Sequence, residues 1–251
     1  MPDRMKGKVA IVTGGASGFG KGIATTFQTE GGSVVITDLS EDTGSAVAKE
    51  IGATFVRADV TKRDDWEKVL KQTLESYGRL DVVINNAGTT YANKPTETVT
   101  DQDFDLVFNV NVRSIYLSTN VILPYFLKEG IKGSFVNIAS TAGIRPRPGL
   151  AWYNASKAAV INATKTMAVE YGPKGIRFNS VCPVFASGTG LSSKFLGKDD
   201  NEANRAGFVA TVPLGRSSTP QDIANACLYL SGDEGSFITG ISLEVDGGRC
   251  V

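Results

Sequence analysis

Two patterns of apolar and polar positions follow one another in turn along the 251-residue chain. Short runs rich in valine and isoleucine are apolar on both sides of the strand, which is typical of strands buried on both faces of a sheet. Seven runs are predicted to be strands: residues 9–12, 34–36, 54–56, 80–84, 134–138, 176–181 and 241–245. Segments with helical spacing separate them, at residues 20–30, 64–77, 103–127, 152–171 and 220–230, and a further helix is expected to begin near Glu41.

Alternation of strands and helices predicts an α/β fold. We expect a doubly wound parallel sheet of about seven strands with helices on both faces, a Rossmann fold, in a single domain over residues 1–251. In such folds the ligand crevice lies beyond the carboxyl ends of the strands. One long stretch, residues 183–213, shows no clear regular structure, and its length predicts a substrate-binding lid at about 184–212.

The equal numbers of basic and acidic residues limit the kinds of binding partner to expect. With 26 basic and 26 acidic residues, the chain shows no global attraction to nucleic acid or to an anionic membrane, so a small-molecule substrate is the expected partner. The first apolar run is interrupted by Thr13 and Gly14, which fits neither a signal peptide nor a membrane span, so we expect a cytoplasmic protein.

Histidine is absent from the chain. Mechanisms of the Ser-His-Asp and Cys-His types are therefore excluded, and acid-base chemistry falls to Tyr, Lys, Asp, Glu or Cys. The three cysteines, Cys182, Cys227 and Cys250, have no metal-ligand spacing. Buried thiols are the favoured interpretation, and no metal site is predicted.

A glycine-rich loop follows the first predicted strand and opens directly into a helix. Gly14, Gly18 and Gly20 permit a tight turn and a close backbone approach to a pyrophosphate group, with Ser17 and Phe19 between them. The next strand ends at Asp38, close to the offset at which a carboxylate binds an adenine-ribose hydroxyl. The alternative is a plain structural turn, with Asp38 capping the helix near Glu41.

The cofactor preference is inferred from Asp38 and its neighbour. A carboxylate there repels a 2′-phosphate, and Leu39 follows in place of an arginine that could neutralise it. NAD (NADH) is therefore predicted in preference to NADP.

Tyr153 and Lys157 are four residues apart on one predicted helix and so lie on one face. A neighbouring ammonium lowers the pKa of a phenol, which would let Tyr153 exchange a proton with an alcohol or carbonyl oxygen. Alone, such a pair more often means a core tyrosine beside a lysine whose charged end reaches solvent. Ser140, which ends the strand-like segment at 134–140, adds a hydroxyl at the same sheet edge.

Together these motifs resemble the short-chain dehydrogenase/reductase superfamily, in its short single-domain branch. The resemblance covers nearly the whole chain in the expected order. It is carried by TGGASGFG at 13–20, Asp59-Val60, Asn85-Asn86-Ala87-Gly88, Asn111, Ser140, Tyr153-Asn154-Ala155-Ser156-Lys157 and Val245-Asp246-Gly247-Gly248.

The resemblance implies roles for these residues. Ser140 would bind the substrate oxygen, Tyr153 would transfer the proton, and Lys157 would hold the nicotinamide ribose and lower the pKa of the tyrosine. Asn111 would position a water beside Lys157, or else fill a helix kink. Asp59 would contact the adenine, with Val60 beside it. Asn86, Ala87 and Gly88 would line the cofactor, or only stabilise the sheet. The resemblance also implies a homotetramer.

The chain departs from the family pattern after the sixth strand. It reads Pro183-Val184-Phe185, with valine in place of the usual glycine, and Thr189 is displaced by one place from the threonine expected to contact the nicotinamide carboxamide. Phe19 replaces a smaller aliphatic residue. Arg145 and Arg147 recognise an acidic substrate group, or else belong to a solvated loop or a subunit contact.

The leading hypothesis is an NAD-dependent oxidoreductase that interconverts a secondary alcohol and a ketone, with Tyr153 as general acid and base. A 3-oxoacyl thioester reductase using NADPH is the second enzyme hypothesis. The third is a catalytically silent dinucleotide-binding regulatory protein, for which an acid-base pair would be unnecessary.

Overall fold

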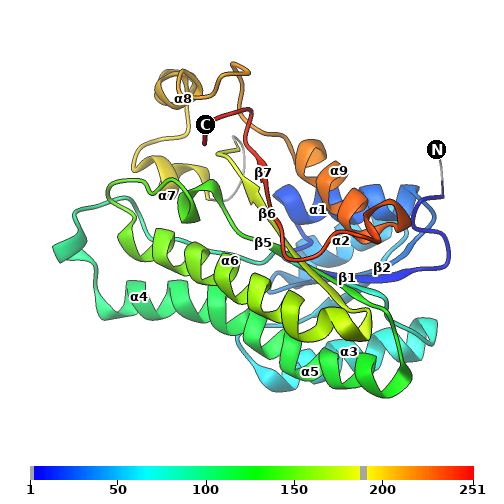
Figure 1. Cartoon of the computed structure of the whole chain (residues 1–251). Coiled ribbons are helices and arrows are strands. Elements are labelled where there is room, and N and C mark those ends of the chain that lie inside the picture. The colour runs from blue at the N-terminus through cyan, green and yellow to red at the C-terminus, as the bar shows by residue number, and fades with distance from the viewer. Residues whose placement is uncertain (1–2, 187–190) are drawn as a thin grey trace.

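A computed structural model describes residues 3–186 and 191–251. Its centre is a parallel sheet of seven strands in the order β3-β2-β1-β4-β5-β6-β7 (Figure 1). The strands are β1 Val9–Thr13, β2 Ser33–Asp38, β3 Thr54–Arg57, β4 Val82–Asn85, β5 Ser134–Ile138, β6 Arg177–Pro183 and β7 Ser242–Val245. From β1 the chain adds β2 and β3 on one side of the sheet and then returns to add β4 to β7 on the other. The crevice expected for a doubly wound sheet lies between β1 and β4, where this order of addition reverses.

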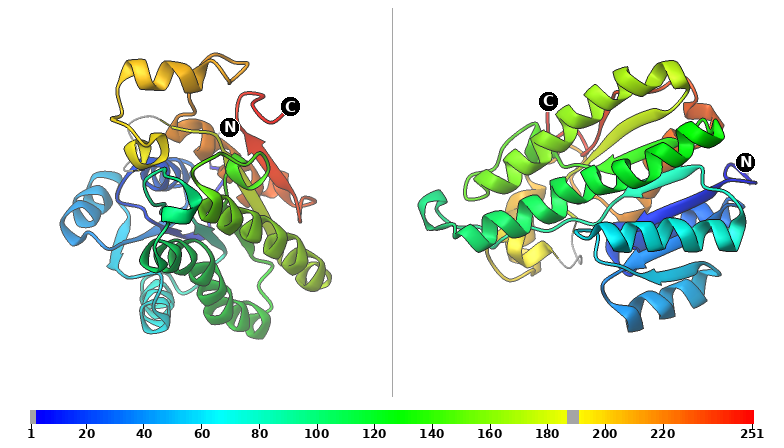
Figure 2. Two further views of the ribbon diagram at one scale, coloured as in Figure 1. Left: turned by 90° about the vertical axis from the view of Figure 1, so that its left-hand side faces the viewer. Right: turned by 90° about the horizontal axis from the view of Figure 1, so that it is seen from below.

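Helices cover both faces of this sheet (Figure 2). The α-helices are α1 Gly18–Thr29, α2 Glu41–Ile51, α3 Arg63–Tyr77, α4 Asp101–Phe108, α5 Ser114–Glu129, α6 Ala151–Tyr171, α7 Ser192–Leu196, α8 Glu202–Val209 and α9 Pro220–Ser231. A π-helical turn, η2 Asn109–Arg113, joins α4 to α5. Short 3-10 turns lie at η1 Thr96–Thr98, η3 Thr141–Gly143, η4 Gly172–Lys174 and η5 Asp233–Gly235.

Successive strand residues point into two separate cores. Val12 packs with side chains of α1, α2 and α9, whereas its neighbour Ile11 packs with side chains of α3 and α5. The same alternation occurs at Val34 and Val35 in β2. Because both faces are apolar, the strands are buried on both sides, and the predicted doubly wound fold is confirmed.

Two segments differ from the sequence prediction. The single helix expected at 103–127 is instead α4, the π turn and α5, because one extra residue is accommodated around Asn111. The segment expected to lack regular structure contains the short helices α7 and α8, which stand outside the sheet and its covering layers (Figure 1). A pattern of 3.6 residues is hard to recognise over five to eight residues.

Two of the three cysteines are buried in the fold. Cys182 and Cys227 are buried as predicted, while Cys250 is only partly buried. Among the helices that the structure describes, none has the length and hydrophobicity to cross a lipid bilayer.

Candidate active site

A cleft of about 470 Å³ lies at the carboxyl ends of the central strands. Its walls come from the loops after β1 to β6 and from α6 and α7. Most of the predicted site residues line it: Gly14, Ser17, Gly18, Phe19, Asp38, Leu39, Asp59, Val60, Asn86, Ala87, Gly88, Ser140, Tyr153, Lys157, Pro183, Val184 and Phe185. Gly20 and Asn111 lie behind its wall, and Thr189 lies outside the described residues.

The glycine loop presents the start of α1 to this cleft. Gly14 and Gly18 have φ angles of 64° and 52°, a backbone region that glycine adopts without strain. A methyl group on Gly20 would lie 2.0 Å from the carbonyl oxygen of Gly14, so the loop closes only because that methyl is absent. The Ser17 side chain makes no capping hydrogen bond, and the first turn of α1 contains no acidic residue. The helix terminus therefore fits the pyrophosphate of a dinucleotide.

Asp38 lies beside this loop at the end of β2. Its two carboxylate oxygens accept hydrogen bonds from the backbone amides of Ala16, at 3.2 Å, and Ser40, at 3.1 Å. Ser40, and not Asp38, is the residue that precedes α2 as its N-cap. The carboxylate is thus held at the cleft wall with acceptor capacity for a ribose hydroxyl.

A cation near this end of the cleft was missed in the sequence. Arg57 is the β3 partner of Asp38 in the strand register. Its guanidinium donates to the carbonyl oxygen of Leu39 at 3.4 Å and lies 4.0 Å from the Glu41 carboxylate. Inspection of the residue after Asp38 could not find it, because only the pairing of β2 with β3 brings it there.

The segment after β4 braces the glycine loop. The Asn86 side chain donates to the carbonyl oxygens of Thr13, at 2.8 Å, and Gly14, at 3.3 Å. The Thr13 hydroxyl in turn accepts from the amides of Asn86 and Ala87. This segment therefore both stabilises the central sheet edge and lines the cleft, so the two alternatives for it are compatible.

At the far side of the cleft, Asp59 stabilises the loop after β3 through hydrogen bonds within that loop. One oxygen accepts from the Thr61 amide at 2.9 Å and from the Thr61 hydroxyl at 2.7 Å. The loop after β3 is thereby fixed, with Asp59 and Val60 both in the cleft wall.

Tyr153, Lys157 and Ser140 converge at the middle of the cleft, and each is less than a tenth exposed. The Lys157 Nζ lies 5.9 Å from the centroid of the Tyr153 ring and donates to the carbonyl oxygen of Ile138 at 2.8 Å. The Ser140 hydroxyl oxygen accepts from the Ala142 amide at 3.1 Å, and the same hydroxyl is within hydrogen-bonding reach of the Tyr153 phenol.

Burial dominates the titration of this pair. It raises the pKa of Tyr153, and hydrogen bonding with Ser140 only opposes that rise. It also lowers the pKa of Lys157 to about 8. The expected lowering of the tyrosine pKa by its lysine neighbour is not what this geometry gives, because the ammonium donates to Ile138 and does not contact the phenol oxygen.

Asn111 lies in the π turn with its side chain fully engaged. Its Oδ1 accepts from the Thr89 amide at 2.8 Å, and its Nδ2 donates to the Thr89 carbonyl and to the Ser156 hydroxyl, both at 3.0 Å. The Ser156 hydroxyl donates onward to the Tyr153 carbonyl oxygen at 2.7 Å. Asn111 thus fills the helix bend and ties it to the helix that carries Tyr153.

Asn111 also borders Lys157. A methyl group on Gly88 would lie 3.4 Å from Asn111 Oδ1 and 3.4 Å from Lys157 Nζ. The two polar atoms therefore border the same position beside the cleft wall, as the predicted role of Asn111 in positioning a water beside Lys157 requires.

Sequence reasoning did not single out several lining residues, which come from strand ends and the loops after them, from α4 and the π turn, and from the segment around α7. They are Thr37, Ala58, Thr89, Thr90, Leu106, Val110, Ile138, Ala139, Ala186, Leu191, Ser192 and Phe195. The strand-end positions follow from the rule that crevices lie at carboxyl edges, so they could have been found. Leu191, Ser192 and Phe195 fall within the lid predicted at about 184–212, but their places in the cleft wall could not be predicted, because nothing in the chain pattern fixes where α7 docks.

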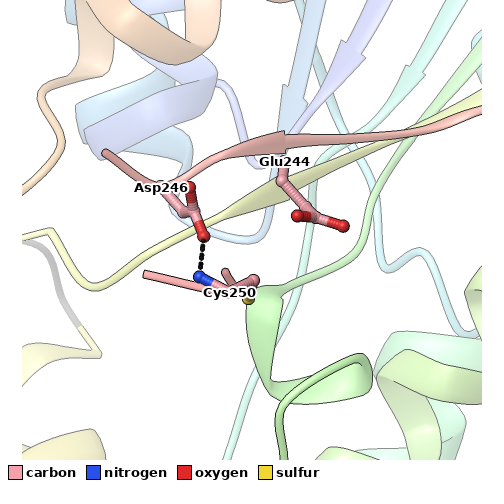
Figure 3. A group of neighbouring side chains, drawn as sticks. All are labelled: Glu244, Asp246 and Cys250. Carbon is pink, nitrogen blue, oxygen red and sulfur yellow. Dashed lines mark hydrogen bonds between the residues drawn. The ribbon is translucent and has the colours of Figure 1, made fainter. Parts of the chain in front are cut away.

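Elsewhere, one trio of ligand-type atoms gathers near the carboxyl end (Figure 3). Atoms of Glu244, Asp246 and Cys250 lie within 4.8 Å of one another. Both Asp246 oxygens already accept backbone hydrogen bonds, from Gly248 at 2.9 Å and Cys250 at 2.7 Å. The carboxylate therefore serves the final turn of the chain, and we assign no metal to it.

Comparison with known proteins identifies the family. A family model described as enoyl-(acyl carrier protein) reductase matches residues 14–249. The chain is 45% identical over 247 residues to 4-formylbenzenesulfonate dehydrogenase of Comamonas testosteroni, with 96% of this chain and 97% of that protein covered. The chain belongs to the short-chain dehydrogenase/reductase superfamily.

Two further relatives show the range of this superfamily. This short-chain dehydrogenase/reductase is 37% identical to the NADP-dependent (R)-specific alcohol dehydrogenase of Lentilactobacillus kefiri, with 99% and 98% of the chains covered. The crystal structure of 3-ketoacyl-(acyl-carrier-protein) reductase from Brucella melitensis complexed with NADH superposes with a TM-score of 0.92 at 39% identity, covering 98% of this chain and 100% of that chain. The protein is therefore an oxidoreductase of CH–OH groups with a nicotinamide dinucleotide cofactor.

Proposed function

We propose that this short-chain dehydrogenase/reductase interconverts a secondary alcohol and a ketone with NAD, using Tyr153 as general acid and base. The observation that carries the proposal is the convergence of Tyr153, Ser140 and Lys157 at the middle of the cleft. A bound nicotinamide supplies or accepts the hydride at the substrate carbon.

Side chains of the protein transfer the proton and bind the substrate oxygen. The Ser140 hydroxyl donates a hydrogen bond to the substrate oxygen, and Tyr153 donates its proton as the alcohol forms. The raised pKa of Tyr153 keeps the phenol protonated, which suits proton donation during reduction. In the reverse direction the phenolate accepts the proton, with the Lys157 ammonium as the nearby cation and the dinucleotide ribose bound through Lys157.

Tyr153→Phe tests this assignment. Only the hydroxyl is lost, so the variant is expected to bind NADH with unchanged affinity and to lose at least about 100-fold in kcat, the usual contribution of a positioned acid or base. Absorbance of the reduced nicotinamide with a panel of ketones measures turnover, and fluorescence titration measures binding. Turnover within a few fold of the wild type would reject Tyr153 as the proton donor.

NAD is proposed over NADP because Asp38 lines the cleft and repels a 2′-phosphate. Arg57 opposes this preference as a nearby cation, but its side chain is 62% exposed and already contacts Leu39 and Glu41. The measurement is kcat/KM with NADH and with NADPH on one ketone. Equal values for the two cofactors would refute the argument from Asp38.

Reduction of a 3-oxoacyl thioester with NADPH is the second candidate, favoured by similarity to the Brucella melitensis 3-ketoacyl reductase, although that enzyme's crystal structure is a complex with NADH. Assay of acetoacetyl-coenzyme A beside simple ketones separates the two. Dinucleotide binding without turnover of any substrate would instead support the regulatory hypothesis.

Three further proposals concern the surroundings of the site. Leu191, Ser192 and Phe195 line the cleft and support a substrate lid at about 184–212. The homotetramer is carried over from the resemblance to the superfamily, and light scattering of the purified protein tests it by its mass. A cytoplasmic location is tested by cell fractionation.

A further inference from the structure

Beyond the catalytic residues, the substrate end of the cleft is built from aromatic rings. The Phe195 ring packs against Tyr153 at 5.9 Å, against Phe185 at 6.0 Å and against Phe208 at 6.2 Å between centroids. Phe185 and Phe195 line the cleft, with Val184 and Leu191 beside them. This wall fits a flat, apolar substrate body that ends beside the Tyr153 hydroxyl.

A guanidinium lies directly behind this wall. The Arg147 Cζ is 4.7 Å from the centroid of Phe195 and 5.1 Å from that of Phe208. Its Nη1 is buried, and no hydrogen-bond partner for that atom exists among the described residues. Burial lowers the pKa of Arg147, and repulsion from Arg249 acts in the same direction.

Two further arginines lie near Arg147. Arg249 lies over the other ring, Phe208, at 5.1 Å, and Arg145 donates to the carbonyl oxygen of Arg249. Within residues 3–186 and 191–251, neither Arg145, Arg147 nor Arg249 forms an ion pair with a carboxylate. Within the described ranges, the half-buried guanidinium of Arg147 thus has an N–H donor without an acceptor and a positive charge without a counter-ion. A bound anion would supply both.

We propose that Arg147 is a specificity-determining residue that binds an anionic group, a carboxylate or sulfonate, on the far end of an aromatic substrate. The reacting carbonyl then lies at Tyr153, the ring of the substrate packs on Phe185 and Phe195, and its acid group reaches past the edge of Phe195 to the guanidinium. This inference rests on the proposed carbonyl chemistry at Tyr153 and adds the substrate class to it.

The test uses a matched pair of ketones, 4-acetylbenzoate and 4-acetylbenzamide, which differ in charge but hardly in shape. The wild type with NADH is expected to prefer the anion. Arg147→Gln is expected to lower kcat/KM for the anion about 10- to 100-fold, the range for a lost hydrogen bond to a charged group, and to change the amide less than about threefold. Arg145→Gln removes the same charge from an exposed position and is the control; it is expected to leave the preference intact.

Binding separates this inference from the proposed reaction. Benzoate and benzamide are titrated into the NADH-saturated protein by calorimetry, which needs no turnover. Tighter binding of benzoate that is lost in Arg147→Gln and kept in Arg145→Gln supports the inference, even if no ketone is reduced and the proposed reaction fails.

Three results overturn it. The first is equal binding of benzoate and benzamide by the wild type, and the second is equal weakening of both by Arg147→Gln. The third is an anion preference that Arg147→Gln leaves unchanged; if the assembly also became smaller by light scattering, the partner of this arginine would lie on a second copy of the chain. Thermal unfolding and NADH affinity show whether the variant is folded.

Discussion

Lys157 offers the sharpest test of the electrostatics of this site, because its charged ammonium group is buried. Its side chain is 4% exposed, and burial lowers its pKa from 10.5 to about 8. Between these two values the unfolded chain holds a proton that the folded chain has released. Stability therefore rises as the pH increases from about 8 to about 10.5, and the cost of the buried charge is present in full below that range.

The magnitude follows from linkage. One pKa unit corresponds to about 1.4 kcal/mol, so the shift at Lys157 costs about 3 kcal/mol at neutral pH. Raising the pH from about 7 to about 9.5 should recover about 2 kcal/mol of this cost. Lys157→Met removes the titrating group with little change in length, so the variant should lack this recovery.

The assay is urea unfolding of both proteins at several pH values, followed by tryptophan fluorescence, to which the buried Trp66 contributes. The free energy of unfolding of the wild type minus that of Lys157→Met should increase by about 2 kcal/mol from about pH 7 to about pH 9.5. Lys165→Met, which changes an exposed lysine on the same helix, should run parallel to the wild type. If Lys157→Met also ran parallel, the burial of its charge could not have the stated effect.

The remaining predictions concern the cofactor half of the cleft. Gly20→Ala places a methyl 2.0 Å from the Gly14 carbonyl and should weaken NADH binding at least about tenfold by fluorescence titration, whereas Gly207→Ala, with open space around it, should leave binding unchanged. Asp38→Asn, which removes only charge, should raise kcat/KM for NADPH relative to NADH by about tenfold, and an unchanged ratio would contradict the proposed repulsion.

Much of this molecule follows from local pattern. The two-sided apolar runs that contain Val12 and Ile36 predict the strands, and Gly14 to Gly20 predict the loop that meets the cleft. These features depend on periodicity and backbone freedom, which the chain carries residue by residue. The same reasoning correctly predicted that Tyr153 and Lys157 share a helix face.

The rest depends on long-range packing. Arg57 comes near Asp38 only through the register of β2 and β3, and Arg147 meets Phe195 only when α7 docks across the cleft. The upward shift in the pKa of Tyr153 has the same origin, since the depth at which a phenol is buried depends on every element packed around it. No spacing along the chain reports these distances.

The π turn at Asn109–Arg113 has a consequence for how this segment tolerates changes in length. A residue deleted there would restore regular α-helical hydrogen bonding and would leave α4 in nearly the same orientation about its axis relative to α5, because the wide turn already absorbs the extra residue. Leu106, which faces the cleft from α4, would keep its position. The segment should therefore lose a residue from this turn at less structural cost than from the middle of α4 or α5, where a deletion turns the rest of the helix by about 100°.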